Sequence, residues 1–184
     1  MGGVTAGDLI VIWLKWEGNT TGDASISDSF SSFVMGTRVD HLNGDLHGQF
    51  GYLLNSPNGG TMTYTVTFPS GATFTRMVAF EFSSTGTISF DTQNTGSGTG
   101  TALASGNITT AGVSDLVLGS YGEYGGGDTS LEQINGQTAT EVVRTISNAS
   151  SWYKSFTSDF TGNSTATLQS AAPWIGNIIA FKSI

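Results

Sequence analysis

The sequence contains no cysteine and few charged residues. The absence of cysteine excludes disulfide bonds and thiolate chemistry, but it does not exclude an extracellular protein, because a core of this size needs no bridges. Lys and Arg number only six, against fourteen Asp and Glu, which gives a net charge of −8. This charge argues against nucleic acid, anionic membranes and anionic polysaccharides as partners, since all of them attract basic surfaces. A neutral or cationic ligand is compatible with it.

Long hydrophobic runs are also missing. The longest, residues 9–14, has the length of a β-strand and is far too short to span a membrane. The N-terminus lacks the basic region and the long apolar stretch of a secretory signal peptide, so we expect no signal peptide in this chain. The first residues fit a boundary inside a longer protein, and we therefore expect the chain to be part of a larger one.

What the sequence does contain is glycine, hydroxyl residues and dispersed aromatics. Glycine accounts for 26 residues, which would suggest disorder in a chain of low hydrophobicity. Here 38% of the residues are hydrophobic, which is enough to build a core. The composition therefore indicates a neutral, hydroxyl-rich β protein, and its length predicts that residues 1–184 form one domain.

Strand patterns run through the whole chain. Residues 8–16 are apolar on both faces and lie between Gly7 and Gly18, as is typical of a central strand whose second face is covered or forms a site. Residues 61–68 alternate hydroxyl and apolar side chains, which predicts a half-exposed strand. No segment shows helical periodicity beyond one turn. Further strands are expected at residues 25–28, 34–40, 46–55, 73–82, 87–91, 101–110, 115–124, 138–145, 151–160, 165–170 and 175–182.

The two halves of the chain resemble one another. Three pairs of segments are alike: residues 5–9 and 110–116, 65–74 and 165–174, and 78–81 and 179–182. Coincidence in a Ser/Thr/Gly-rich sequence is the alternative explanation. Internal similarity of strand-rich halves predicts an all-β, antiparallel two-sheet β-sandwich, jelly-roll-like, with two weakly similar halves. Trp174 aligns with the apolar Phe74, so we expect Trp174, like Trp13, to pack in the core.

Four short motifs suggest a family. In chain order they are Ala6-Gly7-Asp8-Leu9-Ile10-Val11, Val78-Ala79-Phe80-Glu81-Phe82-Ser83, Asp115-Leu116-Val117 and Ile179-Ala180-Phe181-Lys182. Together they resemble the lectin-like jelly-roll modules of phage structural proteins and environmental bacterial surface proteins, which are similar to concanavalin-like and carbohydrate-binding-module sandwiches. The motifs are packing motifs, so they specify the fold better than the function. The resemblance implies an extracellular or virion-surface location.

Sugar binding needs flat aromatic rings that stack on a pyranose and short polar side chains that bind its hydroxyls. Tyr121 lies between two glycines on a predicted strand, and neighbouring Trp152 and Tyr153 point opposite ways, so one of them must leave the core. Core or rim packing is the alternative for the aromatic residues. An ion pair with Arg76, Arg144 or Lys182 is the alternative for Glu81. The candidate ligand-binding residues are Trp16, Glu81, Tyr121, Glu123, Tyr124, Arg144, Trp152 and Tyr153.

Catalytic signatures are weak. Glycoside hydrolysis requires two carboxylates that converge across a cleft, and no strand carries alternating acids. The possible members would be Glu81, Glu123, Asp128 and Glu132. No Gly-x-Ser-x-Gly motif precedes a helix, so a serine-hydrolase elbow is not expected. We therefore expect a protein that is not an enzyme.

Metal binding has no clear sequence pattern either. His41 and His47, with Asp40 and Asp45, match no standard zinc spacing and are expected to be solvated loop residues. Calcium is the more plausible ion, because loop carboxylates are available, but no loop shows a regular ligand register. The loop carboxylates are Asp23, Asp28, Asp91 and Asp128. We therefore expect no cofactor, with calcium as the alternative.

The sequence as a whole favours a non-catalytic carbohydrate-binding module that recognises a neutral polysaccharide by aromatic stacking and polar contacts. A structural domain of a phage or virion, such as a decoration or tail-fibre domain that does not bind sugar, is the alternative. A glycoside hydrolase or lyase is a third and weaker interpretation.

Overall fold

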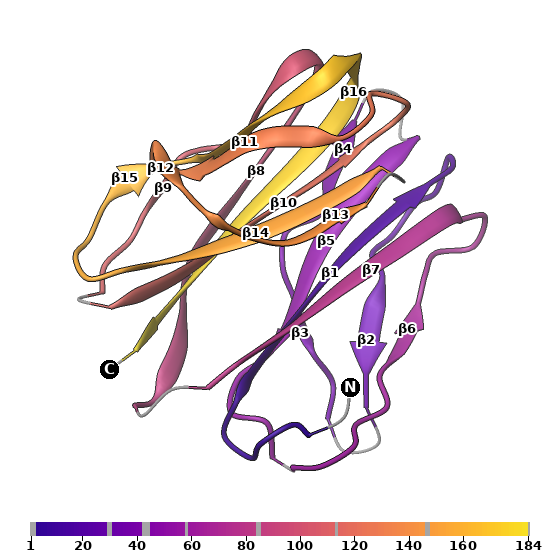
Figure 1. Cartoon of the computed structure of the whole chain (residues 1–184). Coiled ribbons are helices and arrows are strands. Elements are labelled where there is room, and N and C mark those ends of the chain that lie inside the picture. Colours follow the sequence, from indigo (N-terminus) through magenta and orange to yellow (C-terminus); the bar gives the residue numbers. More distant parts are fainter. Residues whose placement is uncertain are drawn as a thin grey trace.

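The computed structural model describes residues 3–28, 31–41, 45–57, 59–83, 86–112, 114–145 and 148–183, with the backbone alone for residues 144–145. Within these ranges the regular secondary structure consists of β-strands, and all strand pairings are antiparallel (Figure 1). The prediction of an all-β antiparallel fold is therefore confirmed. The same residues include no helix with the length and apolar character needed to cross a membrane.

The first large sheet is built around a strand that is buried on both faces. The central strand β1 lies between β5 and β7, and two short strands pair with the far side of β5. Every residue of β1 is buried, including its charged ones. The strands of this sheet are β1 (Leu9–Glu17), β3 (Val34–Met35), β4 (Val39–His41), β5 (Leu46–Leu53) and β7 (Thr73–Phe82).

A small two-stranded sheet covers the outer face of β1. It consists of β2 (Ser25–Ser27) and β6 (Thr65–Thr67). Beneath it lies the outer core, which consists of Val4, Ile10, Ile12, Leu14, Trp16, Ala24, Ile26, Phe33 and Met62. Successive strand residues point to opposite faces, so the alternate residues of β1 are free to fill a second core on the other side. The second face of residues 8–16 is therefore covered rather than open.

The second large sheet has seven strands, with β10 and β16 near its middle. Its order is β12-β11-β16-β10-β14-β13, and β8 also pairs with β16. The strands are β8 (Ile88–Ala104), β10 (Asp115–Glu123), β11 (Thr129–Ile134), β12 (Gln137–Thr138), β13 (Thr140–Thr145), β14 (Ala149–Phe156) and β16 (Ser164–Ser183). A separate pair, β9 (Ile108–Thr109) and β15 (Thr161–Gly162), lies at one end.

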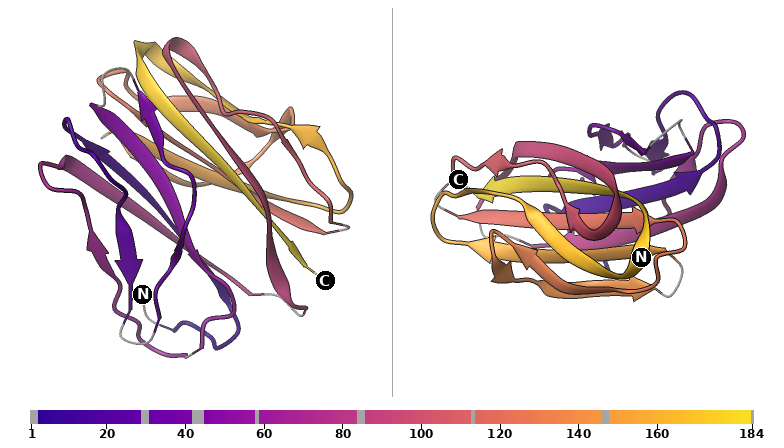
Figure 2. Two further views of the ribbon diagram at one scale, coloured as in Figure 1. Left: turned by 180° about the vertical axis from the view of Figure 1, so that it is seen from behind. Right: turned by 90° about the horizontal axis from the view of Figure 1, so that it is seen from above.

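This second sheet folds back over its own outer face. The pairing of β16 with β8 shifts between Thr167 and Ala172, which divides β16 into two parts. The later part pairs with β10, whereas the earlier part pairs with β11. The fold-back encloses an apolar cluster that includes Val117, Trp152 and Ile178. Figure 2 shows the strands of this half curving over one another.

Two stacked aromatic rings hold the fold-back closed. Tyr121 and Trp152 stack with their centroids 5.1 Å apart. The Tyr121 hydroxyl donates to the Ser164 carbonyl at 2.5 Å and accepts from the Ser105 N–H at 2.8 Å. The Trp152 indole N–H donates to the Ser164 hydroxyl at 3.0 Å. A Cβ at Gly119 would lie only 2.2 Å from that hydroxyl, so glycine is needed for this close approach.

The two large sheets share one apolar core. It joins Leu9, Val11 and Phe80 of the first sheet to Leu118 and Ile179 of the second. A hydrogen bond of 3.0 Å from the Trp13 indole N–H to the Asn177 side-chain oxygen also links the sheets. The predictions that Trp13 and Trp174 are core residues are confirmed, because both are buried.

The two halves of the chain place their main strands in the same order. In the first half β1 lies between β5 and β7, and in the second half β10 lies between β14 and β16. The similar segments 78–81 and 179–182 occupy β7 and β16, the third strand of each triplet. Segments 65–74 and 165–174 differ, because the first spans β6, a turn and the start of β7, whereas the second lies within β16 alone.

The closure of the fold-back can be tested by conservative substitution. Tyr121→Phe removes only the hydroxyl, and we expect it to lower the free energy of unfolding by about 1 kcal/mol. Trp152→Ala should cost about 3–5 kcal/mol, because a large buried ring leaves a cavity. Urea denaturation measures both. Tyr124→Phe, at an exposed position, is the control and should change stability by less than about 0.5 kcal/mol. Equal stability of Tyr121→Phe and Tyr124→Phe would contradict this role of the Tyr121 hydroxyl.

Candidate functional site

A cavity of about 510 Å³ opens at one end of the space between the two large sheets. Residues from both sheets line it, so it lies where the shared core ends rather than on the face of either sheet. The lining residues are Glu17, Gly18, His41, Asp45, Leu46, Thr73, Phe74, Tyr124 and Pro173. We call this cavity the end pocket.

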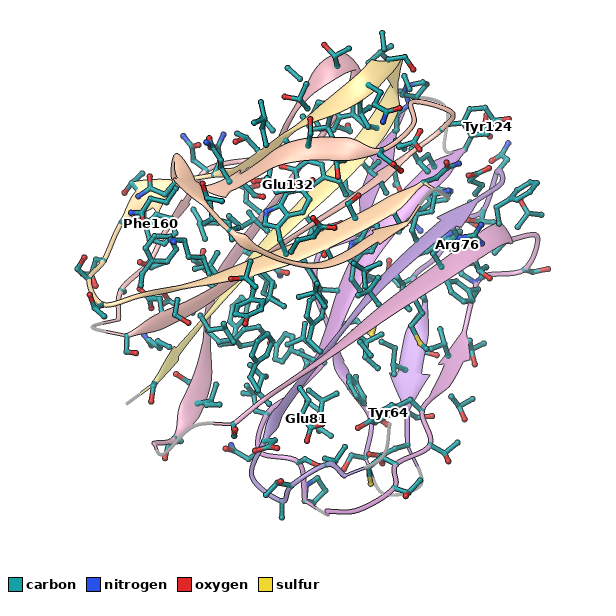
Figure 3. All side chains as sticks on the ribbon, viewed as in Figure 1. Tyr64, Arg76, Glu81, Tyr124, Glu132 and Phe160 are labelled. Atoms are coloured by element: carbon teal, nitrogen blue, oxygen red, sulfur yellow. The ribbon has the colours of Figure 1, made fainter. Side chains whose placement is uncertain are left out.

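The end pocket has a buried floor and an exposed aromatic rim. Glu17, His41 and Leu46 are buried at 6%, 6% and 2% exposure. Phe74 and Tyr124 are 68% and 61% exposed, and among the described residues they are the two large aromatic side chains left open to solvent. Tyr124 projects outward at the edge of the molecule in Figure 3. Two exposed rings thus converge on one cavity, one ring from each half of the chain.

Phe74 is held at the rim by an unusual backbone conformation. Its φ is 46°, in the left-handed region that a bulky side chain rarely adopts. The neighbouring Thr73 hydroxyl donates to the Glu17 carbonyl at 3.3 Å, which ties the start of β7 to the end of β1. Such strain is retained where the surrounding structure fixes it, and it often accompanies functional sites. Neither burial nor backbone preference accounts for a phenylalanine at this position.

Tyr124 lies in a turn that is fastened on both sides. Its own N–H donates to the Pro173 carbonyl at 3.0 Å. The Glu123 carboxylate accepts a hydrogen bond from the Gly126 N–H and so closes the turn around Tyr124. The Gly126 carbonyl in turn accepts from the Ser170 N–H at 3.1 Å. The ring therefore projects from a well-anchored backbone.

Glu17 lines the end pocket, and two further buried charged groups, Lys15 and Glu123, lie close to it. Lys15 and Glu17 form an ion pair, and the Lys15 stem packs so closely on Gly122 that a Cβ there would lie 2.8 Å from it. Burial lowers the pKa of Lys15, and its hydrogen bond to Glu17 opposes the shift. Burial raises the pKa of Glu123, although the Gly126 N–H and the charge of Lys15 act in the opposite direction. One Glu123 oxygen has no hydrogen-bond partner.

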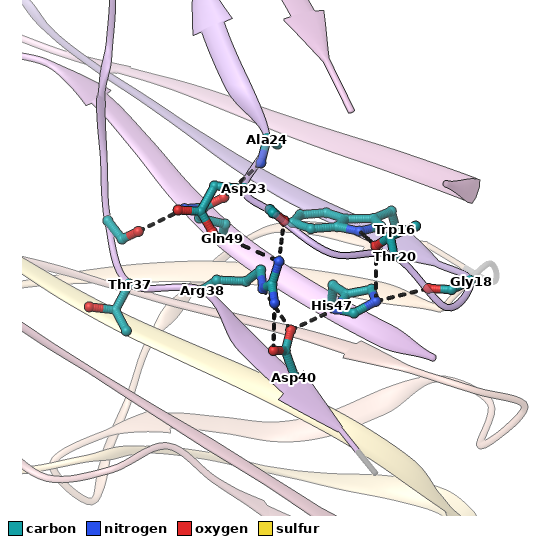
Figure 4. Close-up of polar contacts among 12 residues, drawn as sticks. Trp16, Gly18, Thr20, Asp23, Ala24, Thr37, Arg38, Asp40, His47 and Gln49 are labelled. Carbon is teal, nitrogen blue, oxygen red and sulfur yellow. Dashed lines mark hydrogen bonds and ion pairs between the residues drawn. The ribbon is translucent and has the colours of Figure 1, made fainter. Parts of the chain in front are cut away.

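A hydrogen-bonded network braces the end of β1 from the other side (Figure 4). The Trp16 ring stacks on His47 at 5.1 Å, and its N–H donates to the Thr20 hydroxyl at 2.9 Å. His47 contacts Asp40 through Nδ1 at 2.6 Å and the Gly18 carbonyl through Nε2 at 2.9 Å. Because Gly18 lines the end pocket, this network fixes the backbone of its wall.

The structure corrects three of the predicted stacking residues. Trp16, Tyr121 and Trp152 are at most 1% exposed, and a buried ring cannot stack on a ligand. Trp16 is covered by the outer core, and the other two lie inside the fold-back. The prediction assumed that a strand in a two-layer fold has an open outer face, but the outer faces of the central strands β1 and β10 are covered here.

The remaining predicted residues are divided between the pocket and the body of the protein. Tyr124 lines the end pocket, and Glu123 closes the turn beneath it. Tyr153 is half-buried and packs edge-on against Phe82 with a centroid distance of 5.2 Å. The side chain of Arg144 lies outside the described part of the chain.

Glu81 lies at the opposite end of β7 from the end pocket (Figure 3). Its carboxylate accepts a hydrogen bond from the Thr5 N–H at 3.2 Å. Lys182, one of its expected partners, instead pairs with Asp91 at 3.5 Å. Glu81 and Tyr124 therefore do not belong to one site.

Phe74 was missed by the sequence reasoning. It entered the sequence analysis only as the apolar residue aligned with Trp174, yet Phe74 is exposed and Trp174 is buried. The turn at residues 69–71, directly before it, was the available signal, because the first residues of a strand after a turn lie at a sheet end.

The expectation that His41 and His47 are solvated loop residues is wrong, because they lie on β4 and β5 and are 6% and 0% exposed. His41 Nε2 lies 3.2 Å from the Thr99 hydroxyl, and His47 is paired with Asp40. Hydrogen bonds from His47 and Arg38 overcome the effect of burial and lower the pKa of Asp40. In the part of the chain that the structure describes, no three His, Asp or Glu side chains gather as metal ligands would.

Comparisons with protein-family models, with curated proteins and with solved structures gave no match. The resemblance to lectin-like modules therefore stays an expectation, and the geometry of the end pocket has to support the function.

The pH dependence of stability tests the raised pKa of Glu123, which lies near Lys15 and Glu17. Burial raises its pKa above 4.5, so its carboxyl stabilises the fold while protonated, and this contribution is lost as the pH rises through the raised pKa. Glu123→Gln keeps an acceptor oxygen without the charge. We expect its stability relative to the parent protein to rise between about pH 4 and about pH 7, as measured by urea denaturation.

Asp40→Asn is the control of opposite sign. The pKa of Asp40 is lowered below 3.8, so its stabilisation is present at neutral pH and is lost in acid. The deficit of Asp40→Asn should therefore shrink as the pH falls. A Glu123→Gln profile parallel to that of the parent protein would show that Glu123 titrates normally.

Proposed function

We propose that the chain is a lectin-like, jelly-roll-like β-sandwich that acts as a non-catalytic carbohydrate-binding module for a neutral glycan. The convergence of Phe74 and Tyr124 on the end pocket carries this proposal. A volume of about 510 Å³ lies within the range of small-ligand sites. Another cavity, of about 170 Å³, lies at the opposite end of the shared core and has no exposed aromatic in its lining.

The lining chemistry favours uncharged, hydroxyl-rich ligands. Exposed aromatic rings offer flat faces to the C–H bonds of a pyranose, and Asp45 and Thr73 offer oxygens to its hydroxyls. The described lining residues include two carboxylates, Glu17 and Asp45, and neither lysine nor arginine. With the net charge of −8, this disfavours anionic sugars and nucleic acid. The proposed setting is an extracellular or virion surface, as part of a larger protein.

A structural role on a phage or virion is the second candidate. Among the described residues β7 pairs only with β1, so its other side is a sheet edge, and it exposes Met77 at 52%. An open edge of this kind can pair with a further strand from another chain. Size-exclusion chromatography with light scattering would reveal a defined oligomer if this role is the correct one.

Binding is tested first with immobilised neutral polysaccharides in affinity electrophoresis, with and without calcium. We expect the parent protein to bind at least one of them. Phe74→Ala and Tyr124→Ala should each weaken binding about tenfold or more, equivalent to about 1.4 kcal/mol, because each removes a stacking face. Both residues are exposed, so the free energy of unfolding should not fall by more than about 0.5 kcal/mol.

Leu131→Ala is the matched control. Leu131 is 71% exposed and has a φ of 55°, close to the values of Phe74, but it does not line the end pocket. Its substitution should leave binding unchanged. If the parent protein binds none of the polysaccharides and forms a defined oligomer, the structural role would be favoured instead.

A further inference from the structure

Glycan-binding surfaces that follow a long chain need an open groove or sheet face, and in the described part of the chain the central strands β1 and β10 offer none. The outer face of β1 is covered by β2, β6 and the outer core. The outer faces of β10 and β14 are covered by the fold-back, where Trp152 and Tyr121 bond to Ser164. The inner faces meet in the shared core.

The end pocket is closed at its inner end. Leu46 and His41 form a buried floor, and Glu17 is held there by its ion pair with Lys15. Behind this floor the shared core continues with Trp13, which is fully buried and bonded to Asn177. A ligand can therefore enter from the rim but cannot run through the molecule.

The volume sets a limit on what fits between floor and rim. About 510 Å³ accommodates roughly two sugar rings, and the exposed Phe74 and Tyr124 stand at the outer limit of this space. A polysaccharide threaded past the rim could touch these rings alone, without reaching the polar groups of the floor. Only a chain end reaches both.

We propose that the end pocket captures the terminal sugars of a neutral glycan and does not bind internal segments of a chain. This inference rests on the proposed function. The terminal ring enters toward Glu17 and His41, and the following ring stacks at the rim. Affinity then comes from one end of the chain and is independent of the length beyond it.

The test is isothermal titration calorimetry with size ladders of cello-, xylo-, malto- and chito-oligosaccharides, from about two to about six units. For the ladder that binds, we expect the dissociation constant to stay within about twofold from the dimer upward, with one protein bound per chain. Partial hydrolysis of the parent polysaccharide should raise the binding capacity per mass in proportion to the number of new ends. Borohydride reduction of the oligosaccharide then identifies which end is captured.

The variants and the size ladders together distinguish failure of end capture from failure of carbohydrate binding itself. Phe74→Ala should weaken end-dependent binding about tenfold or more, and Leu131→Ala should preserve it. Affinity that increases steadily with chain length, with a capacity independent of chain ends, would overturn end capture while leaving the carbohydrate-binding function intact. Failure of the parent protein to bind any ladder or polysaccharide would contradict the proposed function itself.

Discussion

The central strands β1 and β10 carry apolar side chains on both faces, and each face has to be removed from water. One face of each strand fills the shared core. The opposite faces account for the other two clusters, the outer core under β2 and β6 and the cluster inside the fold-back. Burial of apolar surface at about 25 cal/mol per Å² is the main driving force for such layering. The covering layers are therefore a consequence of two strands with no polar face, and they leave no open face on β1 or β10 for a ligand.

Polar chemistry is concentrated where these two strands come to an end. Lys15 and Glu17 close β1, and Glu123 closes β10. A buried charge without a partner is costly, which explains the ion pair between Lys15 and Glu17 and the raised pKa of Glu123. Glu123 also closes the turn that carries Tyr124, and Glu17 lines the end pocket. The charged groups that are buried at the ends of β1 and β10 thus lie at or next to the end pocket.

Strand periodicity in the sequence was sufficient to predict an all-β antiparallel protein and a central, doubly buried first strand. The alignment of the two halves placed Trp13 and Trp174 in the core, where both lie, although the aligned Phe74 is exposed. Strand periodicity could not show the fold-back, because a register shift inside a 20-residue strand leaves no local pattern. That one omission explains why Tyr121 and Trp152 were interpreted as ligand-stacking residues. Of the predicted site residues whose side chains the structure describes, Tyr124 alone lines the end pocket, and Phe74 was missed because its exposure depends on a φ of 46°.

The strained backbone of Phe74 is not sufficient evidence of function when taken alone. Leu131 has a similar φ and exposure, and it lies where the register of β11 against β16 shifts. A local irregularity of the sheet explains Leu131, since a bulge leaves a residue unpaired and turned outward. Phe74 also lies in a register shift, where the pairing of β7 with β1 changes between Lys15 and Glu17. The sheet geometry therefore explains the backbone conformation of Phe74, but it does not explain why an exposed aromatic side chain occupies this position. What distinguishes the two positions is the second exposed ring, Tyr124, which reaches the same cavity from the other half of the chain. A ligand that requires both rings is the simplest reason for their convergence.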